Sequence, residues 1–253
     1  MSTISAPLSD SRIMMRRNLK HILRNPVMIF NAAVMPVVLM LLLVYVFGNA
    51  FNVGERYVDY ATPGLIVLAI CYGLAGTAVS VSTDMTKGII NRFKVMNVSR
   101  GAVLTGHVVA TMLISSIAIA VIIGMAFALG FRSSATPLDW LGGIGIAVAA
   151  AFAAAWLTVA LGMAAKTPES AGMAVVPLLL LPFVSSAVVP ADKMGQGIRQ
   201  FAEYQPFTPI IESLRGLLAG TPSGSYAAAA LAWCAGIALV GYLWSRATFS
   251  KRA

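Results

Sequence analysis

The sequence predicts an all-α integral membrane protein, and three observations support that class. Hydrophobic residues make up 58% of the 253 residues and charged residues only 11%, against about 45–50% and about 25% in soluble domains. The mean hydropathy is +0.83. Six segments lack Asp, Glu, Lys and Arg and are long enough to cross a bilayer, which takes about 20 apolar residues. Disorder requires low hydrophobicity and high charge, so a disordered chain is excluded.

The six expected transmembrane helices together occupy more than half of the chain. They cover residues 28–47, 60–81, 103–129, 141–165, 170–189 and 226–245. The longest stretch between them, residues 190–225, is much shorter than a typical domain of about 100 residues. A catalytic or ATP-binding domain is therefore expected in a partner chain. The first span is not interpreted as a signal peptide, because its apolar run exceeds the roughly 7–15 residues of a signal h-region.

The distribution of Lys and Arg predicts the orientation of the chain. With both termini in the cytoplasm, 13 of the 18 basic residues and 3 of the 9 acidic residues lie on the inside. We therefore expect a multi-pass protein of the cell (inner, cytoplasmic) membrane, whose net charge of +9 reflects its topology. Nucleic-acid binding is the weaker interpretation, because no basic domain is present to bind it.

Residues 9–25 are expected to form an N-terminal interfacial amphipathic helix. Apolar side chains recur on one helical face, and basic side chains occupy another. The apolar set is Met15, Leu19, Ile22 and Leu23, and the basic set is Arg12, Arg16, Lys20 and Arg24. Such a helix suits the cytoplasmic headgroup layer. The alternative is a positive-inside flank without regular structure.

Residues 84–100 connect the second and third spans on the cytoplasmic side. Apolar residues share one helical face and polar residues the other, and Arg92 and Phe93 lie at the centre of the segment. A short exposed helix of this kind suits the groove of a partner protein, because interfaces favour aromatic and Arg anchors. A solvated basic loop that only sets the topology explains the same pattern, and the residues alone do not separate the two interpretations.

Residues 190–225 are expected outside the membrane, before the last span. Thr208 is placed to cap a helix with Pro209 at its first position. An apolar stripe at helical spacing follows, made of Phe207, Ile210, Ile211, Leu214 and Leu218. A helix over residues 209–219 would be about 16 Å long, half the thickness of a hydrocarbon core. We predict a short re-entrant or interfacial helix; the alternative is an external loop resting on the membrane surface.

The sequence lacks the motifs of catalysis and cofactor binding. Neither GxxxxGK[ST], HExxH, GxSxG nor a paired CxxC occurs, so neither an ATP site nor a metal site is predicted in this chain. Apart from His107, the spans contain no Asp, Glu, Lys, Arg or His. This argues against a proton-coupled carrier and against an intramembrane enzyme. His21 and His107 are interpreted as structural or interfacial residues. Cys71 and Cys234 lie in apolar runs, which excludes a disulfide scaffold.

Two stretches resemble the permeases of ABC-2 type exporters, and within them the daunorubicin-resistance-type drug permeases. Asp84-x-x-x-Gly88-Ile89-Ile90-x-Arg92-Phe93, followed by Val98-Ser99-Arg100-x-x-Val103-Leu104, is similar to the family's cytoplasmic coupling segment. Residues 182–220 are similar to its pattern of Ser-Ser-x-x-x-Pro, Gln-Pro-x-Thr-Pro and Leu-Arg-Gly-Leu-Leu-x-Gly before the last span. With the six spans and the basic N-terminal helix, the resemblance covers nearly the whole chain.

The resemblance implies one transmembrane domain over residues 1–253 and three groups of site residues. The ATPase-coupling helix would contain Asp84, Gly88, Arg92, Phe93 and Arg100. A connecting helix near the same ATPase would contain Arg12, Arg16, Arg17 and Lys20. Short external helices that cap the pathway would contain Pro190, Glu203, Pro206, Glu212 and Arg215.

The function implied is that of a permease subunit in an ATP-driven exporter of a drug, an antibiotic or an amphiphilic lipid. A separate ATP-binding subunit would hold ATP and Mg²⁺, so we expect neither a cofactor nor enzymatic activity in this chain. A second permease chain, identical or related, and membrane lipid are the other expected partners. Two alternatives stay open: export of lipid-linked glycans, and a membrane scaffold without its own pathway.

Overall fold

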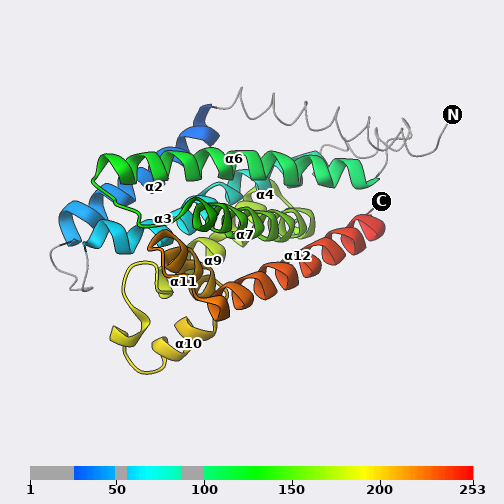
Figure 1. Ribbon diagram of the computed structural model, residues 1–253. Coiled ribbons are helices and arrows are strands. Elements are labelled where there is room, and N and C mark those ends of the chain that lie inside the picture. Colours follow the sequence, from blue (N-terminus) through cyan, green and yellow to red (C-terminus); the bar gives the residue numbers. More distant parts are fainter. Residues whose placement is uncertain (1–25, 49–55, 87–99, 253) are drawn as a thin grey trace.

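The computed structural model describes residues 26–48, 56–86 and 100–252, in which every regular element is a helix. The expected all-α class is confirmed. In chain order the elements are α2 (Pro26–Leu41), the π-helix η1 (Leu42–Phe47), α3 (Tyr57–Tyr72), α4 (Leu74–Thr86), α6 (Arg100–Ala128), α7 (Pro137–Ala164), α8 (Pro168–Ala174), α9 (Val176–Leu180), the 3-10 helices η2 (Leu181–Val184) and η3 (Ala191–Lys193), α10 (Ile198–Tyr204), α11 (Phe207–Leu218) and α12 (Gly224–Arg252). Figure 1 shows α10 set apart below one end of the bundle.

Within the described residues, four helical stretches are long and apolar enough to cross a membrane. They are Tyr57–Thr86, which α3 and α4 form together, Leu104–Ala128, Pro137–Ala164 and Gly224–Ser250. These stretches coincide with the second, third, fourth and sixth expected spans. The first expected span is occupied by α2 and η1, whose apolar part, Ala33–Val46, is shorter. The complete count of six spans therefore stays a prediction.

The fifth expected span, residues 170–189, is divided among short helices instead of forming one straight helix. Its apolar part, Pro168–Val184, contains α8, α9 and η2. Pro177 and Pro182 each lie in the first turn of a new helix. Proline has no N–H to continue the preceding turn, so the helix stops and restarts at these two positions.

Local sequence explains where α7 begins. The Thr136 hydroxyl accepts a hydrogen bond from the Asp139 N–H at 3.3 Å, and the Asp139 carboxylate accepts one from the Thr136 N–H at 2.9 Å. This reciprocal capping box is completed by Pro137 at the first helical position; both features are typical of helix starts. Gly130, at φ +89°, supplies the left-handed residue that turns the chain after α6.

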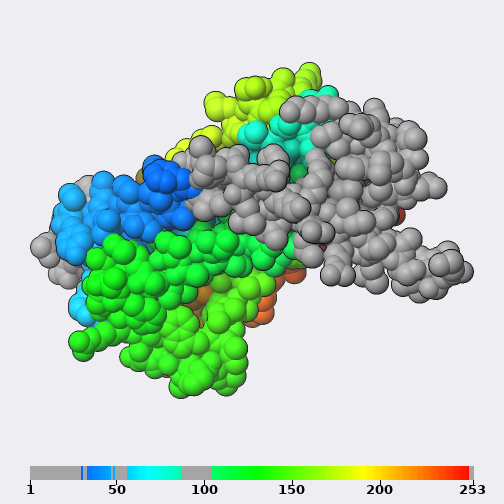
Figure 2. All heavy atoms as spheres, turned by 90° about the horizontal axis from the view of Figure 1, so that it is seen from above, coloured from blue at the N-terminus to red at the C-terminus, as the bar shows by residue number. Residues whose placement is uncertain are grey.

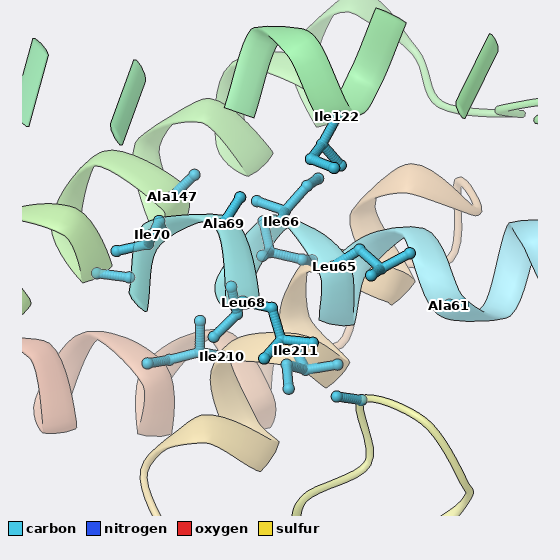
Figure 3. Packing of buried hydrophobic residues seen from close by; sticks show 14 of the residues in the cluster. Ala61, Leu65, Ile66, Leu68, Ala69, Ile70, Ile122, Ala147, Ile210 and Ile211 are labelled. Atoms are coloured by element: carbon cyan, nitrogen blue, oxygen red, sulfur yellow. The ribbon is translucent and has the colours of Figure 1, made fainter. Parts of the chain in front are cut away.

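The central helix of the bundle is α3, and almost every residue from Tyr57 to Cys71 is buried. Figure 3 shows Ile122 of α6 packed above it, and Ile210 and Ile211 of α11 packed below Leu68. Helix α2 also contacts α3 and lies beside α6 on the face seen in Figure 2. A helix that is apolar all round must be surrounded, so the core of the molecule lies along α3.

Glycines let α7 approach two other helices closely. A Cβ atom at Gly162 would lie 2.7 Å from the carbonyl oxygen of Ala78 in α4. A Cβ atom at Gly241 of α12 would lie 2.7 Å from the backbone nitrogen of Leu157 in α7. Real Cβ contacts are longer, so both helix pairs depend on a missing side chain, as close helix packing in membranes commonly does.

The bundle has two ends with different neighbours. At one end, Val81 of α4, Leu104 of α6, Met163 of α7 and Phe249 of α12 form an apolar cluster. This places the C-terminal part of α4, the first turns of α6 and the C-terminal part of α12 together. Figure 1 shows the start of α6 and the end of α12 on its right side. We name this the α4–α6 end. The opposite end holds the α6–α7 loop and α11 and is named the α11 end.

One detail of the sequence interpretation is wrong. Helix α11 begins at Phe207 with Pro206 as its N-cap residue, so Thr208 is not the cap. The Thr208 hydroxyl instead donates a hydrogen bond to the carbonyl oxygen of Ala202 in α10. A threonine hydroxyl can serve either purpose, and only the position of α10 decides between them.

Candidate functional site

Helix α11 packs its apolar stripe into the core. Ile210, Ile211, Leu214 and Leu218 are buried in the central cluster, and Phe207 packs against it from a partly buried position. The helix contacts α3, α7 and α12. The apolar stripe predicted for this helix is confirmed as the buried face of α11. Its burial positions the polar residues of α11 near the start of α3.

Arg215 is the centre of a polar cluster at the α11 end. Its Nη1 contacts the Glu212 carboxylate, and its Nη2 donates to the carbonyl oxygens of Ser186 at 2.7 Å and Tyr60 at 3.3 Å. The guanidinium carbon also lies 3.9 Å from the centre of the Tyr60 ring, within cation–π range. We name Tyr60, Ser186, Glu212 and Arg215 the Arg215 cluster. It joins α11, the chain after η2 and α3 through one side chain.

The Arg215 cluster is largely withdrawn from solvent. The side chains of Arg215 and Glu212 are 14% and 25% exposed. A mostly buried ion pair is stable when its remaining hydrogen-bond donors find acceptors, because the cost of desolvation otherwise offsets the attraction. Arg215 meets that condition, since backbone carbonyls accept from its other nitrogen atoms.

Tyrosine hydroxyls of α3 hold the same stretch of chain in place. The Tyr60 hydroxyl donates to the Ser186 carbonyl at 2.9 Å, and the Tyr57 hydroxyl donates to the Val188 carbonyl at 3.1 Å. A Cβ atom at Gly64 would lie 2.6 Å from backbone atoms of Ala187. The absence of a side chain at Gly64 therefore allows residues 186–188 to lie directly on α3.

Further side chains of the 182–220 stretch hold its turns together. The Gln205 amide donates to the carbonyls of Val184 at 2.6 Å and Leu181 at 3.3 Å. The Ser185 hydroxyl donates to the Pro182 carbonyl. Arg215 of the Leu-Arg-Gly pattern donates to the Ser186 carbonyl of the Ser-Ser pattern, and Gln205 of the Gln-Pro pattern donates to the backbone just before it. These contacts give a structural reason for the residue types.

The predicted external residues do not all meet. Glu212 and Arg215 join the same cluster, and Pro206 caps the helix that carries them. Pro190 precedes η3 as its N-cap residue. Glu203 lies on α10 and pairs with Arg199 at 2.7 Å, with side chains 41% and 50% exposed. The hydrogen bond from Arg199 to Glu203 raises the pKa of Arg199 above its ordinary value.

A second polar tie at the α11 end was not found from the sequence. Arg56 contacts the Asp59 carboxylate at 2.7 Å and donates from Nη1 to the Gly130 carbonyl at 2.8 Å. Asp59 also accepts from the backbone N–H of Arg132 at 3.1 Å. This tie fastens the start of α3 to the α6–α7 loop. The Arg–Asp spacing of three residues is a weak helical signal and does not identify a loop far along the chain.

At the α4–α6 end, Asp84 contacts His107. The Oδ2 atom of Asp84 lies 3.3 Å from Nε2 of His107, and the two side chains are 11% and 6% exposed. Further along the same helices, the hydroxyls of Thr77 and Thr111 lie 2.8 Å apart, and Thr111 also donates to the His107 carbonyl. The two contacts form a polar seam between α4 and α6.

Most of the other predicted coupling residues lie outside the described residues. Arg100 begins α6, but its side chain lies outside the described part of the chain. The same holds for all of the following residues: Gly88, Arg92, Phe93, Arg12, Arg16, Arg17 and Lys20. Their roles stay predictions from the resemblance.

Across the described ranges 26–48, 56–86 and 100–252, no three His, Cys, Asp or Glu side chains gather as metal ligands would. Cys71 and Cys234 are both buried and unbonded to each other. The polar groups that do gather there hold helices and turns together.

The chain matches the ABC-2 type transporter family over residues 10–219, and it belongs to that family. It is therefore a multi-pass membrane subunit of a transporter. Its four long apolar helices agree with that membership.

Two relatives are similar over most of their length. The "Daunorubicin resistance ABC transporter permease protein DrrB1" of Streptomyces coeruleorubidus is 28% identical over 78% of this chain and 70% of the relative. The "Probable doxorubicin resistance ABC transporter permease protein DrrC" of Mycobacterium tuberculosis is 29% identical over 86% of this chain and 79% of the relative. Both similarities extend across the α4–α6 seam and most of the bundle.

Proposed function

We propose that this chain is the membrane permease of an ATP-driven exporter that moves a drug, an antibiotic or an amphiphilic lipid out across the cytoplasmic membrane. Energy comes from ATP and Mg²⁺ in a separate ATP-binding subunit. Membership of the ABC-2 type family is the observation that carries the proposal. The relatives named for resistance to daunorubicin and doxorubicin support the cargo class.

In this proposal six segments cross the membrane, with both termini in the cytoplasm. The excess of Lys and Arg at the termini and in residues 84–100 supports that orientation. The grouping of the α4 end, the α6 start and the α12 end agrees with it, because the orientation requires these three on one side. The α4–α6 end then faces the cytoplasm, and the α11 end faces outward.

The α11 end acts as the external gate, with α11 as a re-entrant helix. Its length of 12 residues corresponds to about 18 Å, too short to cross a hydrocarbon core of about 30 Å. Glu212 and Arg215 hold the chain after η2 against α3. Outward opening would rearrange these contacts, whereas Pro190, Pro206 and Glu203 shape the short helices around them.

The opposite end receives the force of the ATPase. Asp84, Gly88, Arg92, Phe93 and Arg100 would belong to the coupling helix, and Arg12, Arg16, Arg17 and Lys20 to the connecting helix beside it. Two ATP-binding subunits that close on each other require two permease chains, identical or related. Transport then consists of a change between two packings of the spans.

Reconstitution tests the proposal directly. The chain would be purified with its ATP-binding subunit, inserted into liposomes, and assayed for ATP-dependent movement of doxorubicin, whose fluorescence reports its location. We expect doxorubicin to be moved and to stimulate ATP hydrolysis, and neither to occur with a non-hydrolysable nucleotide. A complex that hydrolyses ATP but moves a lipid-linked glycan would reassign the cargo. Failure of any ATPase to co-purify would support the scaffold alternative.

A further inference from the structure

We propose that Thr77, Asp84, His107 and Thr111 form a polar clasp that makes α4 and α6 move as one unit when the coupling segment is displaced. The clasp residues act as positioning residues, since they act through the helices that they join. This inference rests on the proposed function, because it concerns how force from the ATPase reaches the spans.

The clasp has two levels along the same pair of helices. The level nearer the helix ends is the Asp84–His107 contact of 3.3 Å, and the deeper level is the Thr77–Thr111 contact of 2.8 Å. The Thr111 hydroxyl also contacts the backbone carbonyl of His107, one turn earlier in α6, at 2.8 Å. Two levels resist rotation of one helix against the other, which a single contact would permit.

The two helices otherwise pack against different neighbours. Helix α4 packs mainly on α7 and α8, whereas α6 packs mainly on α2, α3 and α7. A Cβ atom at Gly162 of α7 would lie 2.7 Å from the carbonyl oxygen of Ala78 in α4, closer than real Cβ contacts, so α4 packs closely on α7. Apolar side chains of both helices, Val81 and Met85 of α4 and Leu104, Val108 and Met112 of α6, belong to a cluster that they share with α7 and α12. The polar contacts add directional connections between α4 and α6 that this apolar packing does not provide.

The level nearer the helix ends, the Asp84–His107 contact, has a chemistry that is unusual for a membrane helix. A carboxylate and an imidazole are costly to bury, and such residues in spans are commonly functional. A pair of apolar residues would fill the same space without that cost. The directional contact between Asp84 and His107 provides what apolar packing does not, namely a fixed relative position of two helix ends.

The clasp lies at the helix ends that flank the predicted coupling segment. Chain connectivity joins the end of α4 to the start of α6 through residues 87–99, the predicted coupling segment. A displacement of that segment acts on both helices at once. With the clasp in place, α4 and α6 follow together; without it, each helix relaxes against its own neighbours and part of the motion is lost.

A disulfide tests the rigidity of the deeper level. In a background with Cys71→Ala and Cys234→Ala, Thr77→Cys and Thr111→Cys place two thiols where hydroxyls now lie 2.8 Å apart, close enough for a bond with modest adjustment. The oxidised complex in liposomes is expected to move doxorubicin as fast as the reduced one. A loss on oxidation that dithiothreitol reverses would overturn the proposal.

Substitution tests the Asp84–His107 level of the clasp. Asp84→Leu with His107→Leu removes both polar groups of the pair, so the chain should still insert. Because Asp84 also belongs to the predicted coupling segment, the ATPase bound by each variant is measured by co-purification and transport is expressed per bound ATPase. We expect several-fold fewer doxorubicin molecules moved per ATP hydrolysed. Asp84→Asn keeps an acceptor for His107 and should retain most coupling. The matched control is Thr83→Val, whose hydroxyl contacts only its own helix at Val79, and it should behave as the wild type. Normal coupling in the double variant would overturn the proposal.

A distance measurement separates failure of the clasp from failure of the proposed function. Spin labels at Thr83→Cys and Leu113→Cys report the α4–α6 separation of the purified ATPase complex in each nucleotide state. We expect one unchanged distance distribution with wild-type Asp84 and His107, and a broader one that shifts with nucleotide in the double leucine variant. Identical distributions in both would overturn the clasp, even in a complex that does not move doxorubicin.

Discussion

At the scale of single residues, Arg215 has the most connections at the α11 end. Its guanidinium contacts a carboxylate on its own helix, two backbone carbonyls from other segments and the ring of Tyr60. The planar fork of an arginine makes several directed contacts at once, which a lysine cannot. The exposed Arg199–Glu203 pair on α10 has the same residue types without these additional contacts.

We predict that Arg215→Ala destabilises the protein markedly. It leaves Glu212 partly buried without its ion-pair partner and removes hydrogen bonds to the carbonyls of Tyr60 and Ser186. The expected loss is about 2–4 kcal/mol, measured as a lower midpoint of thermal unfolding in detergent. Arg215→Lys should recover only part of it.

Arg199→Ala is the matched control. Exposed ion pairs contribute little to stability because solvent screens them, so its midpoint should stay close to that of the wild type. Equal shifts for Arg199→Ala and Arg215→Ala would show that the additional backbone contacts of Arg215 have no effect on stability.

At the scale of elements, the contact of α4 with α7 depends on the missing side chain of Gly162. A Cβ atom there would lie 2.7 Å from the Ala78 carbonyl oxygen and 3.0 Å from the Val81 Cβ atom. Backbone atoms cannot rotate away as the tip of a flexible side chain can. The whole helix must therefore shift, and overpacking of this kind is destabilising.

We predict that Gly162→Ala lowers stability by about 1–3 kcal/mol, measured by thermal unfolding and by the yield of monodisperse protein in detergent. Gly145→Ala, in the same helix, has no atom within 4 Å of the new Cβ position and should be neutral or stabilising, because alanine favours helices. A reversed order of the two variants would contradict the close fit of α4 on α7.

Another prediction concerns the coupling segment. Arg92→Glu with Phe93→Ala reverses the charge and removes the aromatic anchor of the predicted docking helix. We expect the chain to reach the membrane in normal amount but to lose ATP-driven export. The measurements are membrane abundance and doxorubicin accumulation in cells. Unchanged export would reduce residues 84–100 to a connecting loop.

At the scale of the whole molecule, the orientation of the two ends is the central prediction. In a background without Cys71 and Cys234, cysteines at Thr3 and Ser250 should be shielded from a membrane-impermeant thiol reagent in intact cells. A cysteine at Ser223 should be labelled. Permeabilised cells are the control, in which Thr3→Cys and Ser250→Cys should react. Labelling of both termini in intact cells would contradict a cytoplasmic location.

The sequence predicted the helical class, six spans of which four coincide with long apolar helices of the structure, and the buried face of α11, because these depend on composition and periodicity. A continuous apolar run predicts one helix over residues 170–189, whereas Pro177 and Pro182 each lie in the first turn of a new helix. The sequence placed Asp84 in the coupling segment by resemblance and treated His107 as structural. The two residues are 23 positions apart in the chain and lie on different helices, so no periodicity in the sequence indicates their contact.

By itself the sequence determined that this chain is a helical membrane protein of the ABC-2 type, since hydropathy, charge bias and local motifs are properties of neighbouring residues. Only the tertiary structure decided that Arg215 reaches Tyr60 and Ser186, that Gly162 lies on α4, and that Asp84 meets His107. The physical reason is that these contacts join residues remote in the chain. They depend on how helices pack, and helix packing is set by the shapes of all the side chains together.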